Sequence, residues 1–180
     1  PEKLRLLLST NKNIYLNEIL TSIKKTTNNI NFIYNNQNNI NLQEQDIVFI
    51  DNKTNVKTSL LKAFLRDGGH IIFFPNKNNE TLPSYLLEIN NIDLSNNFIK
   101  NNNNSFNIIN FKSKALPFIT NNNTDIINNI KFYKYIELDN NINSMLSLTD
   151  DISIWNRYEI GNGILDIFGF SNDLTWTNLP

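Results

Sequence analysis

Residues 60–76, LLKAFLRDGGHIIFFPN, decide the fold expected for this chain. The first six carry leucine and phenylalanine at one-, three- and four-residue spacings, as on the apolar face of an amphipathic helix. Gly68 and Gly69 can adopt the left-handed conformation that ends a helix and reverses the chain. Residues 71–74 form an unbroken apolar run, typical of a strand covered on both faces, and Pro75 ends it. Helix, glycine turn and buried strand are the parts of an open α/β sheet.

The same pattern precedes this stretch. Short apolar runs at 4–8, 30–34 and 46–51 are expected to be strands, and residues 16–25 keep helical spacing. Thr54 or Asn55 is expected to cap the helix that leads to the glycine pair. Helices between apolar strands make βαβ units, which predict a parallel sheet with right-handed crossovers.

The second half of the chain is rich in strand signals. The expected elements are a short helix over 82–89, an exposed asparagine-rich loop over 90–104, and strands over 106–111, 131–138, 145–148, 152–158 and 164–170. Gly161 and Gly163 separate the last two strands, as a hairpin turn requires. We therefore predict a single α/β domain over 1–180. Its sheet is mainly parallel, with helices on both faces and a β-rich, partly antiparallel C-terminal portion.

The amino-acid composition narrows the classes of function that the chain can have. The chain has 180 residues, 38 of them asparagine, with 16 basic and 17 acidic residues and a net charge of −1. This balance creates no field that would attract nucleic acid, and no nucleic-acid partner is expected. No apolar run reaches the roughly 18 residues of a membrane span. Because the sequence begins at Pro1 and stops at Pro180, we expect a domain taken from a longer chain, with any membrane segment outside it.

The sequence offers few groups for catalysis. It has no cysteine, and His70 is its one histidine, placed at the start of a strand, where a structural or exposed role is expected. Zinc and copper sites are therefore not expected, and neither is any other metal. No nucleophile elbow, dinucleotide fingerprint or P-loop is present, so no cofactor is predicted.

Ligands of open parallel sheets bind beyond the carboxyl ends of the strands. The polar and aromatic residues expected at that edge form the candidate binding site: Thr10, Asp51, Asn76, Lys77, Ser171, Asp173 and Trp176. Polar residues also gather wherever strands end in loops, whether or not they bind anything.

The C-terminal sequence GNGILDIFGFSNDLTWTNLP resembles the ending of a domain in large bacterial membrane proteins, the aerotolerance-regulator (BatA-type) proteins of Bacteroidetes. The matching residues there are Gly161, Gly163, Ser171, Asp173, Trp176, Thr177, Leu179 and Pro180. The central stretch is similar to another segment of that domain through Leu61, Phe64, Leu65, Gly68, Gly69 and Pro75. Residues 115–118, ALPF, lack the histidine that the family tends to have before its proline.

This resemblance implies a class I glutamine-amidotransferase-like, flavodoxin-like fold. It also implies a parent anchored in the bacterial inner membrane, with this domain on the extracytoplasmic, periplasmic side. True amidotransferases of that fold have a cysteine after the strand that here ends at Phe74 and Pro75. This chain has Pro75 and Asn76 there, so the resemblance implies that the glutaminase reaction is lost.

Three functions remain open at this point. The first is a non-catalytic scaffold or binding domain with protein partners in the cell envelope. The second is a hydrolase or transferase in which Asp51 and Asp173 share acid–base work, which requires both carboxylates in one cavity, roughly 5–10 Å apart. The third is an extracytoplasmic sugar- or peptide-binding module that uses Trp155, Trp176 and the edge amides.

Overall fold

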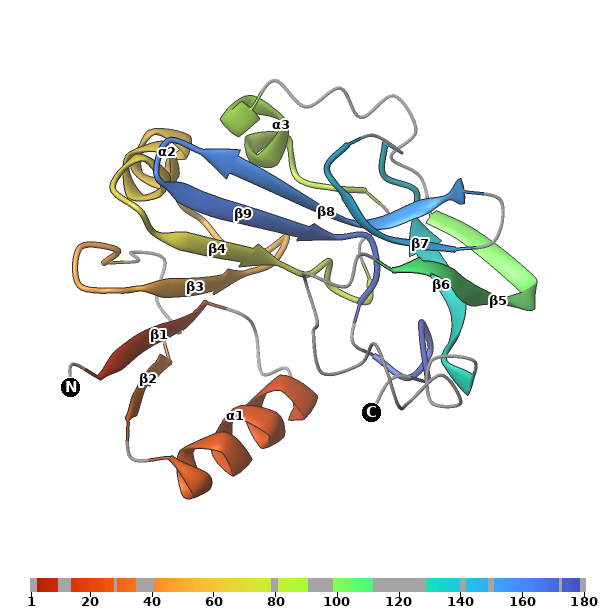
Figure 1. The fold of residues 1–180 in the computed structure, drawn as a ribbon, viewed down its shortest axis with the longest axis horizontal. Coiled ribbons are helices and arrows are strands. Elements are labelled where there is room, and N and C mark those ends of the chain that lie inside the picture. Colours follow the sequence, from red (N-terminus) through yellow and green to blue (C-terminus); the bar gives the residue numbers. More distant parts are fainter. Residues whose placement is uncertain are drawn as a thin grey trace.

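The chain folds around one mixed β-sheet (Figure 1). The structure is a computed structural model. It describes residues 3–9, 14–27, 29–34, 41–78, 81–90, 99–111, 129–139, 142–148, 151–171 and 173–178. Within these ranges the elements are β1 (Leu4–Ser9), α1 (Ile14–Thr26), β2 (Ile30–Tyr34), β3 (Ile47–Ile50), α2 (Thr58–Arg66), β4 (His70–Phe73), α3 (Ser84–Asn90), β5 (Ile99–Phe111), β6 (Lys131–Ile136), β7 (Ser144–Leu148), β8 (Ser153–Ile160) and β9 (Gly163–Phe168).

The described strands form a nine-stranded sheet in the order β2-β1-β3-β4-β9-β8-β7-β5-β6. The pairs from β2 to β9 are parallel, and those from β9 to β6 are antiparallel. β4 lies inside the parallel part, because Ile71 is opposite Val48 of β3 and Leu165 of β9. The predicted α/β class, with its parallel first half and antiparallel later part, is confirmed.

Helices lie on both faces of the sheet, although they are few. α2 and α3 contribute Leu61, Leu65 and Leu86 to a large core that also contains Ile71 of β4. On the other face, Leu20 of α1 packs in a smaller cluster over β1 and β3. Figure 1 shows α1 on the opposite side of the sheet from α2 and α3. On the face of the sheet that α1 covers, Ile72 of β4 is only half-buried, because α1 lies over β1 and β3.

The glycine turn between α2 and β4 has the predicted role, with different reasons for the two glycines. Gly68 has φ +98°, and its N–H donates to the Leu65 carbonyl, so it reverses the chain at the end of the helix. Gly69 is needed for space instead, because a Cβ there would overlap the ring of Phe64. The hairpin turn is also as predicted, with Gly163 paired to Ile160.

Two local predictions are wrong. α2 begins at Thr58 after Lys57, which has no side-chain cap, while Thr54 is buried and its hydroxyl accepts the N–H of Asp51 (3.0 Å). Thr54 therefore closes the turn after β3, and neither it nor Asn55 caps the helix. The predicted loop over 90–104 is also wrong from Ile99 onward, because β5 begins there. Residues 99–101 pair with β6 despite the low strand preference of asparagine, and the register shifts between Asn101 and Phe106.

Candidate functional sites

The predicted ligand edge begins with Asp51, directly after β3. Its carboxylate is buried and accepts the Lys53 N–H (2.8 Å), while its carbonyl accepts the Tyr85 hydroxyl (2.9 Å). Burial raises the pKa of Tyr85 well above its usual value, which keeps this hydroxyl protonated as a donor. These bonds order the loop after β3 and tie it to α3.

Asn76, which follows β4, is held by the loop that follows β3. Its backbone N–H donates to Asn52 Oδ1 (2.8 Å), and Asn52 Nδ2 in turn donates to the Thr81 carbonyl (2.8 Å). The segment after β4 is therefore clamped to the segment after β3.

Lys77, Asp173 and Trp176 lie together at this edge. Lys77 Nζ is 3.4 Å from Asp173 Oδ2, with side chains 58% and 24% exposed. The fully buried Trp176 donates its indole N–H to the Lys77 carbonyl (3.3 Å). Asp173 also accepts the N–H and hydroxyl of Thr175, and these bonds, with the charge of Lys77, lower the pKa of Asp173.

Of the other predicted site residues, Ser171 is buried in the segment after β9 and Thr10 lies outside the described residues. Trp155 and Trp176 are 5% and 0% exposed. Neither indole offers an open face for a sugar to stack on, so the receptor hypothesis loses the stacking role of its two tryptophans.

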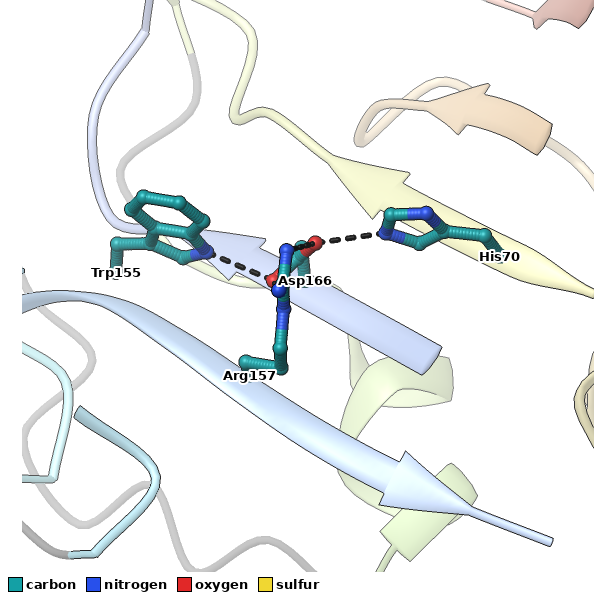
Figure 2. Close-up of polar contacts among 4 residues, drawn as sticks. All are labelled: His70, Trp155, Arg157 and Asp166. Carbon is teal, nitrogen blue, oxygen red and sulfur yellow. Dashed lines mark hydrogen bonds and ion pairs between the residues drawn. The ribbon is translucent and has the colours of Figure 1, made fainter. Parts of the chain in front are cut away.

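A second polar cluster, on β4, β9 and β8, was not predicted (Figure 2). At its centre is Asp166 of β9, only 2% exposed. Arg157 donates to both carboxylate oxygens, through Nε (2.9 Å) and Nη2 (2.8 Å). Trp155 Nε1 is 2.8 Å from Oδ1, and His70 Nε2 is 2.7 Å from Oδ2. We call these four residues the Asp166 cluster.

The hydrogen-bond donors around Asp166 determine whether its carboxyl group is ionised. Burial by itself raises the pKa of a carboxyl group, but the hydrogen bonds from His70, Arg157 and Trp155 outweigh it and hold the pKa of Asp166 below its usual value. The carboxylate is therefore ionised near neutral pH, and Arg157 compensates its charge. Such a fully bonded carboxylate joins three strands.

Aromatic rings extend the cluster along the same face. Phe168 stacks between Trp155 (4.8 Å between ring centroids) and Phe74 (4.3 Å). The Arg157 guanidinium carbon lies 5.6 Å from the centre of the Trp155 ring. These contacts fix the orientation of the indole and of the guanidinium.

One sequence signal could have found part of this cluster. Asp166 interrupts an apolar strand, and the hairpin turn alone sets the register that places Arg157 opposite it. His70 could not be assigned in this way, because it reaches Asp166 only through the pairing of β4 with β9. Its predicted place at the start of a strand is confirmed.

The described residues contain no group of three His, Asp or Glu side chains arranged to hold a metal ion. Over the same ranges, no helix has both the length and the apolar character needed to cross a membrane.

Comparison with known proteins finds no matching family model and no matching curated protein. Solved structures do share the fold. The cytoplasmic protein STM1381 of Salmonella typhimurium LT2 is 11% identical, with a TM-score of 0.66, and the alignment covers 96% of this chain and 90% of that one. The cytoplasmic protein STM3548 of Salmonella typhimurium is 10% identical, with a TM-score of 0.64 and coverage of 97% and 89%.

Part of a larger enzyme is also similar. A β-galactosidase from Bacillus circulans sp. alkalophilus is 13% identical, with a TM-score of 0.52, and the alignment covers 96% of this chain but 29% of the enzyme. At these identities the likeness concerns the fold alone. The chain shares its mixed α/β architecture with about nine-tenths of each Salmonella protein and with less than a third of the β-galactosidase.

Proposed function

We propose that this chain is a non-catalytic, glutamine-amidotransferase-like domain that serves as a scaffold or binding module. Its parent would be a membrane-anchored bacterial cell-envelope protein of the BatA type. In this proposal the domain has a flavodoxin-like ancestry, lies on the extracytoplasmic side and contacts protein partners. The membrane anchor belongs to segments outside residues 1–180.

The segment after β4 carries the proposal. β4 lies inside the parallel part of the sheet, and the chain continues from it through Pro75 to Asn76, whose N–H is held by Asn52. A proline and a bonded asparagine cannot supply the thiolate that glutamine hydrolysis requires. The fold's likeness to a segment of a larger glycosidase also supports a role as a building block in longer chains.

The alternative is carboxylate-dependent hydrolysis or group transfer at the same edge. Asp51 follows β3 and Asp173 follows β9, with β4 between the two strands. Each carboxylate is bound within its own loop, Asp51 by Lys53 and Asp173 by Thr175. Such bonds favour an ordering role for both carboxylates over a proton-transfer role.

An activity assay separates the two proposals. Wild type and an Asp51→Asn/Asp173→Asn double variant are compared for ammonia release from glutamine and for hydrolysis of nitrophenyl glycosides and esters. Circular dichroism confirms that both are folded. The scaffold proposal expects the same background rate from both proteins. Turnover by wild type that the double variant lacks would establish the hydrolase instead.

The membrane part of the proposal needs the full-length chain. We expect it to sediment with the inner membrane, and we expect protease added to spheroplasts to cleave this domain while a cytoplasmic marker survives. Recovery of the full-length chain in the soluble fraction, or protection of the domain until lysis, would refute the proposed location.

A further inference from the structure

The edge of the sheet opposite the predicted one contains a cavity of about 690 Å³, which is within the range of small-molecule sites. It lies between α2 and residues 41–46, which lead into β3. Leu60, Ala63, Phe64 and Asp67 line one side and share one helical face at three- and four-residue spacings. None of the predicted site residues takes part.

The wall of this cavity joins an apolar surface to hydrogen-bond acceptors. Leu42 and Phe64 are 7% and 8% exposed, and Leu60 leaves half of its surface open to solvent. The small side chain of Ala63 leaves room between them. Such a surface suits an aliphatic chain of a few methylene groups.

Two groups on the wall favour a cationic donor. Gln45 lines the cavity, and its buried Oε1 accepts no hydrogen bond from any described residue, so a turn of this side chain toward a bound donor would supply the missing bond. Asp67 is exposed at the C-terminal end of α2, where the helix dipole adds to its negative charge. No other described residue forms an ion pair with it.

The other charges on the wall cancel. Arg5 donates its backbone N–H to Asp46 (2.7 Å), and its guanidinium Nη2 lies 3.2 Å from Asp46 Oδ1. The charged residues that line the cavity are thus one arginine and two aspartates, a net charge of −1 that belongs to Asp67.

We propose that this cavity binds an alkylammonium group, meaning a primary cation on an aliphatic chain, as in a lysine side chain or a free diamine. The aliphatic part lies along Leu42, Leu60 and Phe64, and the cation pairs with Asp67, while the Gln45 side chain turns its Oε1 toward the bound donor. This inference deepens the proposed binding role of the domain and rests on it.

Two probes test the site and distinguish the sources of the cation. Acetyl-Leu-Lys-Leu-amide and 1,5-diaminopentane are titrated into the isotope-labelled protein, and backbone and side-chain amide shifts are followed by NMR. We expect saturable shifts at Gln45, Asp67 and Gly69 with the peptide. A stronger response to the diamine would assign the site to free amines. The matched peptide with norleucine in place of lysine is expected to bind at least tenfold more weakly.

Three variants locate the binding. Asp67→Asn removes the charge and Ala63→Phe fills the space, and each is expected to weaken peptide binding at least tenfold. Both positions are exposed, so neither change should unfold the protein. Glu18→Gln, an exposed change on α1 away from the cavity, is expected to leave the affinity unchanged.

The inference is overturned if neither probe shifts these amides, if the norleucine peptide binds equally well, or if Asp67→Asn and Ala63→Phe have no effect. None of these results would change the outcome of the activity and location assays. Failure of this binding site can therefore be told apart from failure of the proposed function.

Discussion

Two aspartates of the same sheet show how differently the fold treats a charge. Asp173, in the loop after β9, pairs with one exposed lysine, and the partners are 24% and 58% exposed. Asp166, inside β9, is 2% exposed and receives donors from His70, Trp155 and Arg157. Water can replace Lys77 at the first site, but little water reaches the second.

This difference shows which polar groups the stability of the sheet depends on. The loop pair can be lost with little effect, since exposed ion pairs contribute about 0–1 kcal/mol. The Asp166 cluster links β4, β9 and β8 where the parallel and antiparallel parts of the sheet meet. We therefore expect the stability of the sheet to depend on Asp166 and hardly at all on Asp173.

Truncation of the buried carboxylate should have the largest effect. Asp166→Ala leaves Arg157, His70 and Trp155 without their acceptor, and we expect it to lower the free energy of unfolding by about 3–5 kcal/mol. Urea titration followed by tryptophan fluorescence measures the loss, with Asp173→Ala as the matched control. Equal losses for the two variants would remove the distinction between the sites.

Lowering the pH should weaken the stabilisation by Asp166 without removal of a side chain. The pKa of Asp166 is lowered on folding, so its stabilisation is complete above the unfolded value of about 3.9 and is lost as pH falls through the folded pKa. We expect the stability advantage of wild type over Asp166→Asn to shrink below about pH 4. Urea titrations from pH 7 down to pH 3 test this, and a constant difference would contradict it.

The two buried tryptophans give a finer comparison. Trp155→Phe preserves an aromatic ring beside Phe168 but removes a donor to a carboxylate, and we expect a loss of about 1–2 kcal/mol. Trp176→Phe removes a longer bond to a neutral carbonyl. Because a change in ring size affects both variants, the excess cost of Trp155→Phe in thermal unfolding reports the charged hydrogen bond. A larger loss for Trp176→Phe would contradict this ranking.

Breaking the loop pair should have the smallest effect. Lys77→Ala is expected to cost at most about 1 kcal/mol, and this cost should disappear near 1 M salt, where exposed charges are screened. Thermal unfolding of wild type and variant in low and high salt provides the measurement. A cost that persists in high salt would mean that Lys77 acts through packing.

Much of the architecture could be predicted because it depends on local pattern. The apolar runs at β1, β2, β3 and β4 and the glycine turn identify the parallel part before any contact is known. The hairpin of β8 and β9 follows from Gly161 and Gly163. β5 was missed over residues 99–104, since strand formation by asparagines depends on a partner strand about 30 residues later.

The candidate sites likewise divide into one that the sequence predicted and one that it did not. Lys77, Asp173 and Trp176 were expected at one edge because parallel strands end together, and the fold brings these three together. The cavity was not predicted, because tertiary packing brings its two sides, residues 41–46 and α2, together.

The sequence by itself determined the alternation of apolar strands and helices, the glycine turn and the absence of a thiol after β4. Those features reside in neighbouring residues and need no distant contact. Only the tertiary structure decided that Asp166 is ionised within the sheet, and that His70 donates to it from a strand 96 residues away. The reason is physical: a buried charge is stable only among donors, and sheet pairing brings the donors of β4 and β8 to the carboxylate on β9.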